Sequence, residues 1–61
     1  MSVELACKFI SETDSAVLVL LDDTAEEEWF PLSQVEEMHK NKAGVGSIVI
    51  SEWLARKRGL R

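Results

Sequence analysis

Carboxylate side chains dominate the middle of this 61-residue chain, and their chemistry is the recognition of positive charge. No lysine or arginine occurs between Phe9 and Met38, whereas nine acidic residues do. A surface of one sign can present charges in place of phosphates and occupy a basic groove on a partner. The alternative is an ordinary solvated turn and strand end. The candidate partner-binding acids are Asp22, Asp23, Glu26, Glu27, Glu28, Glu36 and Glu37.

The C-terminal third has the opposite charge. From His39 onward there are six lysines and arginines and a single acid, Glu52, so the net charge of -4 belongs to a bipolar molecule. A cluster of bases at a helix end could contact phosphates with salt-dependent affinity. It could equally complement the helix dipole and keep the surface soluble. The alternative nucleic-acid-binding residues are Arg56, Lys57, Arg58 and Arg61.

The sequence does not predict an enzyme, a metal site or a cofactor site. Cys7 and His39 are far apart, and no catalytic motif surrounds either of them. The acidic stretch 22–27 lacks the alternation and the glycine of a calcium-binding loop. Gly44-Val45-Gly46 lacks the remainder of any nucleotide-binding fingerprint. Binding through an outer surface is therefore the expected mode of action.

Length and composition limit the architecture that can position these charges. Residues 1–61 can form one small domain, which buries only about 60% of its unfolded surface and leaves little room for a deep pocket. One cysteine allows no disulfide within the chain, which fits a reducing cytoplasm. The N-terminus does not look like a signal peptide, and the longest apolar run, 16–21, is too short to span a membrane.

Hydrophobic periodicity predicts mostly strands. Residues 4–9 alternate, with Leu5, Cys7 and Phe9 on one face. The run 16–21 is apolar on both faces, as in a central strand, and residues 26–30 are expected to form a third strand, ended by Pro31. The segment from Leu32 to Lys40 is ambiguous, since its apolar spacing of three also suits a helical turn. A fourth strand is expected at 47–50.

A short helix is predicted after the last strand. Ser51 is a favourable N-cap, Gly59 a favourable residue just past the helix end, and Leu60 could complete a Schellman motif. We therefore expect the α+β class: a small antiparallel curled sheet of about four strands, barrel-like, with one short C-terminal helix. Trp29 and Phe30 must point to opposite sides of their strand, so one is a candidate exposed contact. Trp29 and Trp53 are both expected in the core, and the alternative is that they are anchors of an interface.

Two segments resemble a short module found in phage and prophage proteins. They are Trp29-Phe30-Pro31-Leu32-Ser33-Gln34-Val35 and, later, Ile48 to Leu60 with its Glu52-Trp53-Leu54-Ala55 centre. The resemblance covers most of the chain from Ser15 onward, with departures at Phe30, Leu32 and Ser51. It implies a small β fold and a mobile-element context, and it carries no defined activity or functional residue.

These observations lead to one main hypothesis and one alternative. The main hypothesis is a non-enzymatic phage or mobile-element protein in the cytoplasm of a bacterial host. Its acidic surface would bind a basic groove of a host protein or ribonucleoprotein complex and inhibit a nucleic-acid-targeting defence, as anti-CRISPR proteins do. The alternative is a small-barrel nucleic-acid binder that uses the basic C-terminal helix. A monomer or weak homodimer is expected, without membrane attachment.

Overall fold

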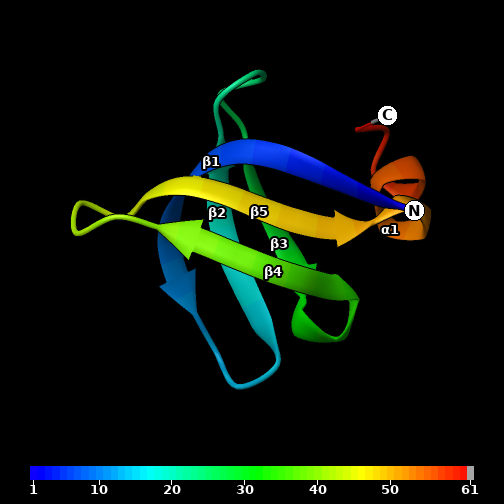
Figure 1. Cartoon of the computed structure of the whole chain (residues 1–61), viewed down its shortest axis with the longest axis horizontal. Coiled ribbons are helices and arrows are strands. Elements are labelled where there is room, and N and C mark those ends of the chain that lie inside the picture. Colours follow the sequence, from blue (N-terminus) through cyan, green and yellow to red (C-terminus); the bar gives the residue numbers. More distant parts are fainter. Residues whose placement is uncertain (61) are drawn as a thin grey trace.

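Five strands, one turn of 3-10 helix and one short α-helix make up the part of the chain that the structure describes. The computed structural model describes residues 1–60. All neighbouring strands pair antiparallel, in the order β3-β2-β1-β5-β4 (Figure 1). Among residues 1–60, no helix is long and apolar enough to cross a membrane. The elements are β1 (Ser2–Glu12), β2 (Ala16–Leu21), β3 (Glu27–Pro31), η1 (Leu32–Gln34), β4 (Val35–Lys40), β5 (Val45–Ser51) and α1 (Glu52–Lys57).

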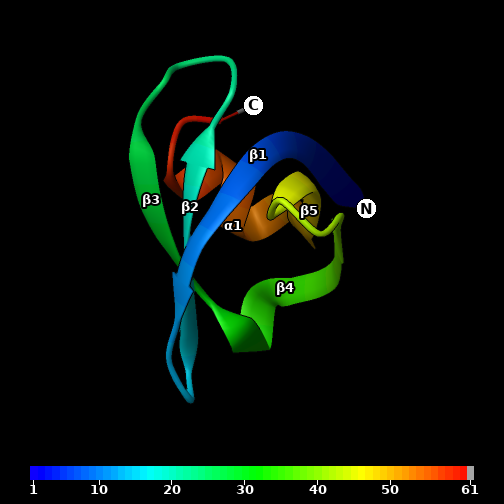
Figure 2. The ribbon, with the colours of Figure 1, turned by 90° about the vertical axis from the view of Figure 1, so that its left-hand side faces the viewer.

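The long strand β1 is shared by two hairpins. Its residues from Ser2 to Lys8 pair with β5, whereas those from Cys7 to Glu12 pair with β2. The register of the β1–β2 pair shifts between Phe9 and Ser11, as at a β-bulge, which bends and twists a strand. In Figures 1 and 2 β1 arches over, so that the β2–β3 and β4–β5 hairpins run in crossing directions. The sheet therefore wraps around its own inner face.

The expected antiparallel sheet with one short C-terminal helix is confirmed, whereas the expected number of about four strands and the barrel-like form are corrected. The sheet has five strands, and β3 and β4 form its two edges without pairing to each other, so it does not close into a barrel. The additional strand is β4, which occupies most of the segment whose apolar spacing also suited a helix. Only Leu32–Gln34 is helical. Hydrogen bonding to the next strand, β5, decides the conformation of β4, and the apolar spacing within the segment does not.

The core lies on the inner face of the curled sheet and is covered by α1. The face predicted for the first strand is confirmed, because Cys7 is fully buried and Leu5 and Phe9 are half-buried. Alternate residues of β2 are buried, as expected for an interior strand. The buried residues are Cys7, Val17, Val19, Leu21, Phe30, Ile48, Ile50, Leu54 and Ala55.

Both predicted ends of the helix are confirmed. The Ser51 hydroxyl accepts a hydrogen bond from the Leu54 amide at 3.1 Å, which satisfies one of the unpaired donors of the first turn. At the other end Gly59 has φ of +69°, and its amide donates to the Arg56 carbonyl. The Leu60 amide donates to the Ala55 carbonyl at 2.8 Å, completing a Schellman motif. These caps hold a helix that is too short to be stable alone.

Replacement of Gly46 tests the close approach of β4 and β5. A Cβ atom at this position would lie 1.7 Å from the backbone carbonyl oxygen of His39, so the two strands would have to separate. We expect Gly46→Ala to lower the free energy of unfolding by about 3 kcal/mol, measured by urea denaturation. Gly59→Ala is the matched control. A Cβ atom at this position would meet no other atom, so only the positive φ disfavours alanine there, and the free energy of unfolding should fall by about 1 kcal/mol. An equal loss in both variants would contradict the predicted packing.

The thiol of Cys7 provides a test of the core. Burial, and secondarily the Asp22 carboxylate, raise the Cys7 pKa from 9.0 to about 11. Because the pKa is higher in the folded state, the neutral thiol favours folding below about pH 9, and this contribution disappears as pH rises through about 11. Cys7 is fully buried, so a thiol reagent reaches it only when the chain unfolds transiently. At pH 8 we therefore expect the reagent to modify the native chain about 100-fold more slowly than the urea-unfolded chain. Comparable rates would show that Cys7 is accessible.

Candidate protein-binding surface

Four of the predicted acids lie together on the hairpin between β2 and β3. Asp22, Asp23 and Glu26 occupy the turn, and Glu27 begins β3; all four are exposed. Within residues 1–60 none of the four forms an ion pair. Their side chains are therefore available to a partner. We refer to Asp22, Asp23, Glu26 and Glu27 as the acidic hairpin.

The turn that carries these acids is ordered by its own hydrogen bonds. The Leu21 amide donates to the Glu26 carbonyl and the Ala25 amide donates back to the Leu21 carbonyl, both at 2.9 Å. The Glu26 amide also donates to the Thr24 hydroxyl at 3.3 Å. Ala25 has φ of +58°, an uncommon value for a residue other than glycine. The carboxylates of the acidic hairpin are thus held on a defined backbone, which lowers the entropy lost on binding.

Glu28 has a different role from its sequence neighbours. It lies opposite Val19 in the β2–β3 pair and is partly buried. Its Oε1 atom is 2.9 Å from Nη1 of Arg58, and the Arg58 guanidinium lies 5.6 Å from the centre of the Phe30 ring. A predicted acidic-site residue and a predicted basic-site residue therefore bind each other. This contact fastens the end of α1 to β3 and removes Glu28 from the acidic surface.

The remaining two acids lie on the other edge of the sheet. Glu36 and Glu37 belong to β4, whereas the acidic hairpin is attached to β3, so the structure divides the predicted site between the two edge strands. Glu36 accepts a hydrogen bond from the Ser2 hydroxyl. Glu37 contacts Nε2 of His39 at 2.9 Å. The acids share one segment of the sequence that contains no lysine or arginine, but in the folded chain they do not form one continuous negative patch.

One acid near the second group was missed by the sequence analysis. Glu4 and Glu37 are both paired with Val49, on either side of β5, which places the two carboxylates on the same outer face. The Ser47 hydroxyl donates to Oε2 of Glu4 at 2.8 Å. Alternation along β1 indicated that Glu4 points outward. Its proximity to Glu37 required knowledge of the strand order.

The three predicted basic residues that the structure describes each contact another side chain of the protein. Nη2 of Arg56 lies 2.6 Å from Oε1 of Glu52, one turn earlier in α1. Nζ of Lys57 lies 5.3 Å from the centre of the Trp53 ring, a cation–π contact. Arg58 pairs with Glu28, and Arg61 lies outside the described residues. These contacts match the interpretation in which the basic residues stabilise the helix end and keep the surface soluble. The side chains of Arg56 and Lys57 are nevertheless exposed and can still reach a partner.

The expectation that both tryptophans are core residues is wrong. Trp29 is 45% exposed and Trp53 is 58% exposed, whereas Phe30 is completely buried. The prediction that Trp29 and Phe30 point to opposite sides of β3 is confirmed. Phe30 is the residue on the inner face of the sheet, where it pairs with Val17 of β2. In α1 it is Leu54 that enters the core instead of Trp53. A helix that contacts the sheet through one narrow face can bury only some of its apolar residues.

Comparison with protein-family models, curated proteins and solved structures gives no match to this chain. The properties of the surface itself therefore indicate what the protein can bind. Within residues 1–60 no group of three or more histidine, cysteine, aspartate or glutamate side chains is arranged to hold a metal ion. The exposed acidic hairpin and the neighbouring Trp29 on the same edge strand are the features best suited to bind another protein.

Tryptophan fluorescence tests the outward placement of both indole rings. Because Trp29 and Trp53 are exposed, we expect native emission close to that of an indole in water, with only a small shift on unfolding. Acrylamide should quench the native chain nearly as well as the unfolded chain. Trp29→Phe and Trp53→Phe variants separate the two signals. Blue-shifted, poorly quenched emission from either variant would contradict the exposure of its remaining tryptophan.

Proposed function

We propose that this chain is a non-enzymatic interaction protein that binds a basic groove of a nucleic-acid-handling protein or ribonucleoprotein complex. The acidic hairpin is the contact. The observation that carries the proposal is its set of four exposed carboxylates on an ordered turn, without ion-pair partners in residues 1–60. A protein that occupies such a groove competes with the nucleic acid and thereby inhibits the complex.

The shape of the hairpin supports this mode of binding. In Figure 1 the β2–β3 turn projects beyond the rest of the sheet, so it can enter a groove before other parts of the molecule make contact. Carboxylates in that position compete with phosphates for the arginine and lysine side chains of the partner. Attraction between opposite charges accelerates association and weakens as salt rises. Trp29, which follows on β3, can add apolar contact beside the charges.

The resemblance to a phage module suggests a biological setting for this inhibition. Its two segments correspond to the end of β3 with η1, and to β5 with α1. Those elements form part of the sheet and its helical cover. In the proposed setting the chain belongs to a phage or other mobile element and blocks a nucleic-acid-targeting defence of its bacterial host, in the manner of an anti-CRISPR protein.

Affinity capture from bacterial lysate with two charge-matched variants tests the proposal. Glu26→Gln/Glu27→Gln removes two carboxylates from the acidic hairpin, and Glu36→Gln/Glu37→Gln removes two from β4. We expect the wild-type chain and the β4 variant to capture a defined protein complex that survives nuclease treatment. The hairpin variant should bind that complex at least tenfold more weakly, since each lost charged contact costs about 1 kcal/mol or more. Glu28 is left intact because it stabilises the fold.

The outcomes of this experiment distinguish binding by the acidic hairpin from attraction by the net charge of the protein. Equal weakening in both variants would show that net charge, not the hairpin, attracts the partner. Undiminished capture by the hairpin variant would overturn the proposal. Nuclease-sensitive capture that the hairpin variant retains in full would also overturn it and would favour nucleic-acid binding by Arg56 and Lys57. Circular dichroism of both variants confirms that the comparison is made between folded proteins.

A further inference from the structure

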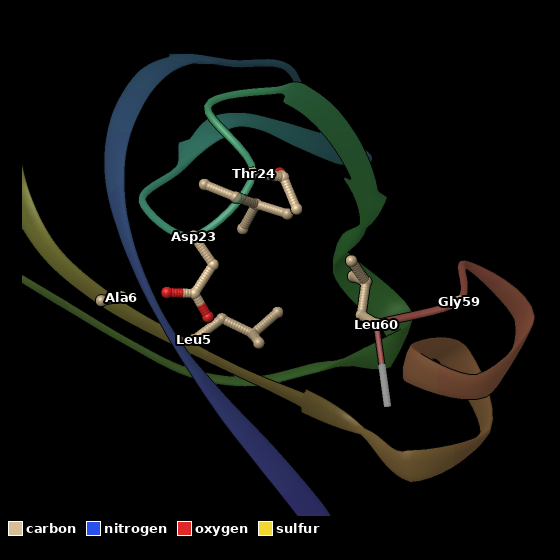
Figure 3. Close-up of a pocket in the computed structure, with 7 residues that line it drawn as sticks. Leu5, Ala6, Asp23, Thr24, Gly59 and Leu60 are labelled. Carbon is tan, nitrogen blue, oxygen red and sulfur yellow. The ribbon is translucent and has the colours of Figure 1, made fainter.

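A small cavity opens beneath the acidic hairpin, between β1, the β2–β3 turn and the chain after α1. Its volume is about 150 Å³. Leu5, Leu21 and Leu60 form apolar parts of its lining, and Asp23 and Thr24 line it from the turn (Figure 3). These residues come from three separate parts of the sequence, so the cavity exists only in the folded chain.

One charged side chain, that of Asp23, belongs to this lining. In Figure 3 its carboxylate points from the turn toward Leu5, across the cavity from Leu60. Asp23 and Thr24 are exposed, so the polar side of the cavity is in contact with water. Asp23 has no ion-pair partner within residues 1–60. The cavity thus combines an apolar interior with a negative charge at its rim.

That combination fits an aliphatic chain that ends in a cation. The apolar walls remove methylene groups from water, and the carboxylate binds the charged end at the surface. A cavity of about 150 Å³ can hold a group the size of benzene, which is ample for four methylene groups. It is well below the roughly 300 Å³ of a typical small-molecule cleft. A single side chain of a partner protein is therefore a better occupant than a metabolite.

We propose that this cavity binds one lysine side chain of the partner protein. The inference rests on the proposed function, in which the acidic hairpin meets a basic groove, and it identifies the contact at the centre of that interface. Lysine suits the cavity better than arginine because its ammonium is a compact charge with three donors. One carboxylate and surface water can satisfy those donors, whereas the planar guanidinium has five in a fixed arrangement.

A small-molecule titration tests the cavity without any partner. n-Butylammonium reproduces the stem and charge of lysine, n-butanol has the stem alone, and methylammonium has the charge alone. In ¹H–¹⁵N NMR spectra we expect n-butylammonium to shift the amides of Leu5, Asp23, Thr24 and Leu60 with a millimolar dissociation constant. Both partial probes should bind several-fold more weakly. Asp23→Asn should weaken n-butylammonium binding about three- to tenfold.

Asp22→Asn is the matched control, because it removes the neighbouring carboxylate from the same turn but not from the cavity lining. It should leave n-butylammonium binding within about twofold. Equal responses to n-butanol and n-butylammonium, or equal effects of the two variants, would overturn the inference. Stronger binding of n-butylguanidinium would overturn the assignment to lysine.

The same two variants separate this inference from the proposed function. If lysine enters the cavity, Asp23→Asn should weaken capture of the partner complex more than Asp22→Asn does. If both variants weaken capture equally while Glu26→Gln/Glu27→Gln abolishes it, the acidic hairpin binds the partner and the lysine site is wrong. If the hairpin variant captures the complex normally, the proposed function fails whatever the NMR titration shows.

Discussion

The shared strand β1 is the constraint on which the rest of the structure depends. Its first half pairs with β5 and its second half with β2, and the two pairings overlap at Cys7 and Lys8. The strand must bend there, so the two hairpins cross and enclose an inner face. Cys7 occupies the overlap and is fully buried, which leaves room for little more than a small side chain. A larger residue would force the hairpins apart and open the core.

The helix α1 covers that inner face, and its attachment determines which charges remain available. Leu54 and Ala55 fill the core, and Arg58 then contacts both Glu28 and Phe30 on β3. The ion pair is partly exposed, so its contribution to stability is modest. Its larger consequence is for function. It withdraws one acid and one base from the surface and leaves the four carboxylates of the acidic hairpin beside an apolar cavity.

The candidate site was predictable from the sequence only in part. The run of acids identified Asp22, Asp23, Glu26 and Glu27, because turn-forming residues with like charges point toward water in nearly any fold. It could not show that Glu28 turns inward or that Glu36 and Glu37 lie on the opposite edge. It also could not reveal the cavity, whose lining residues Leu5, Asp23 and Leu60 are far apart along the chain. Charge is a local property, whereas proximity depends on strand order.

The sequence by itself determined the local elements: the alternating first strand, the interior strand at 16–21, the placement of Trp29 and Phe30 on opposite sides of their strand, and the capped helix after Ser51. These follow from periodicity and from backbone preferences that act over a few residues. Only the tertiary structure decided that 35–40 is a strand, that the sheet stays open, and that Trp53 faces solvent while Leu54 is buried. The strand at 35–40 depends on its pairing with the neighbouring β5, and the other two outcomes depend on how elements distant in sequence pack together. The apolar pattern within a single segment shows none of these contacts.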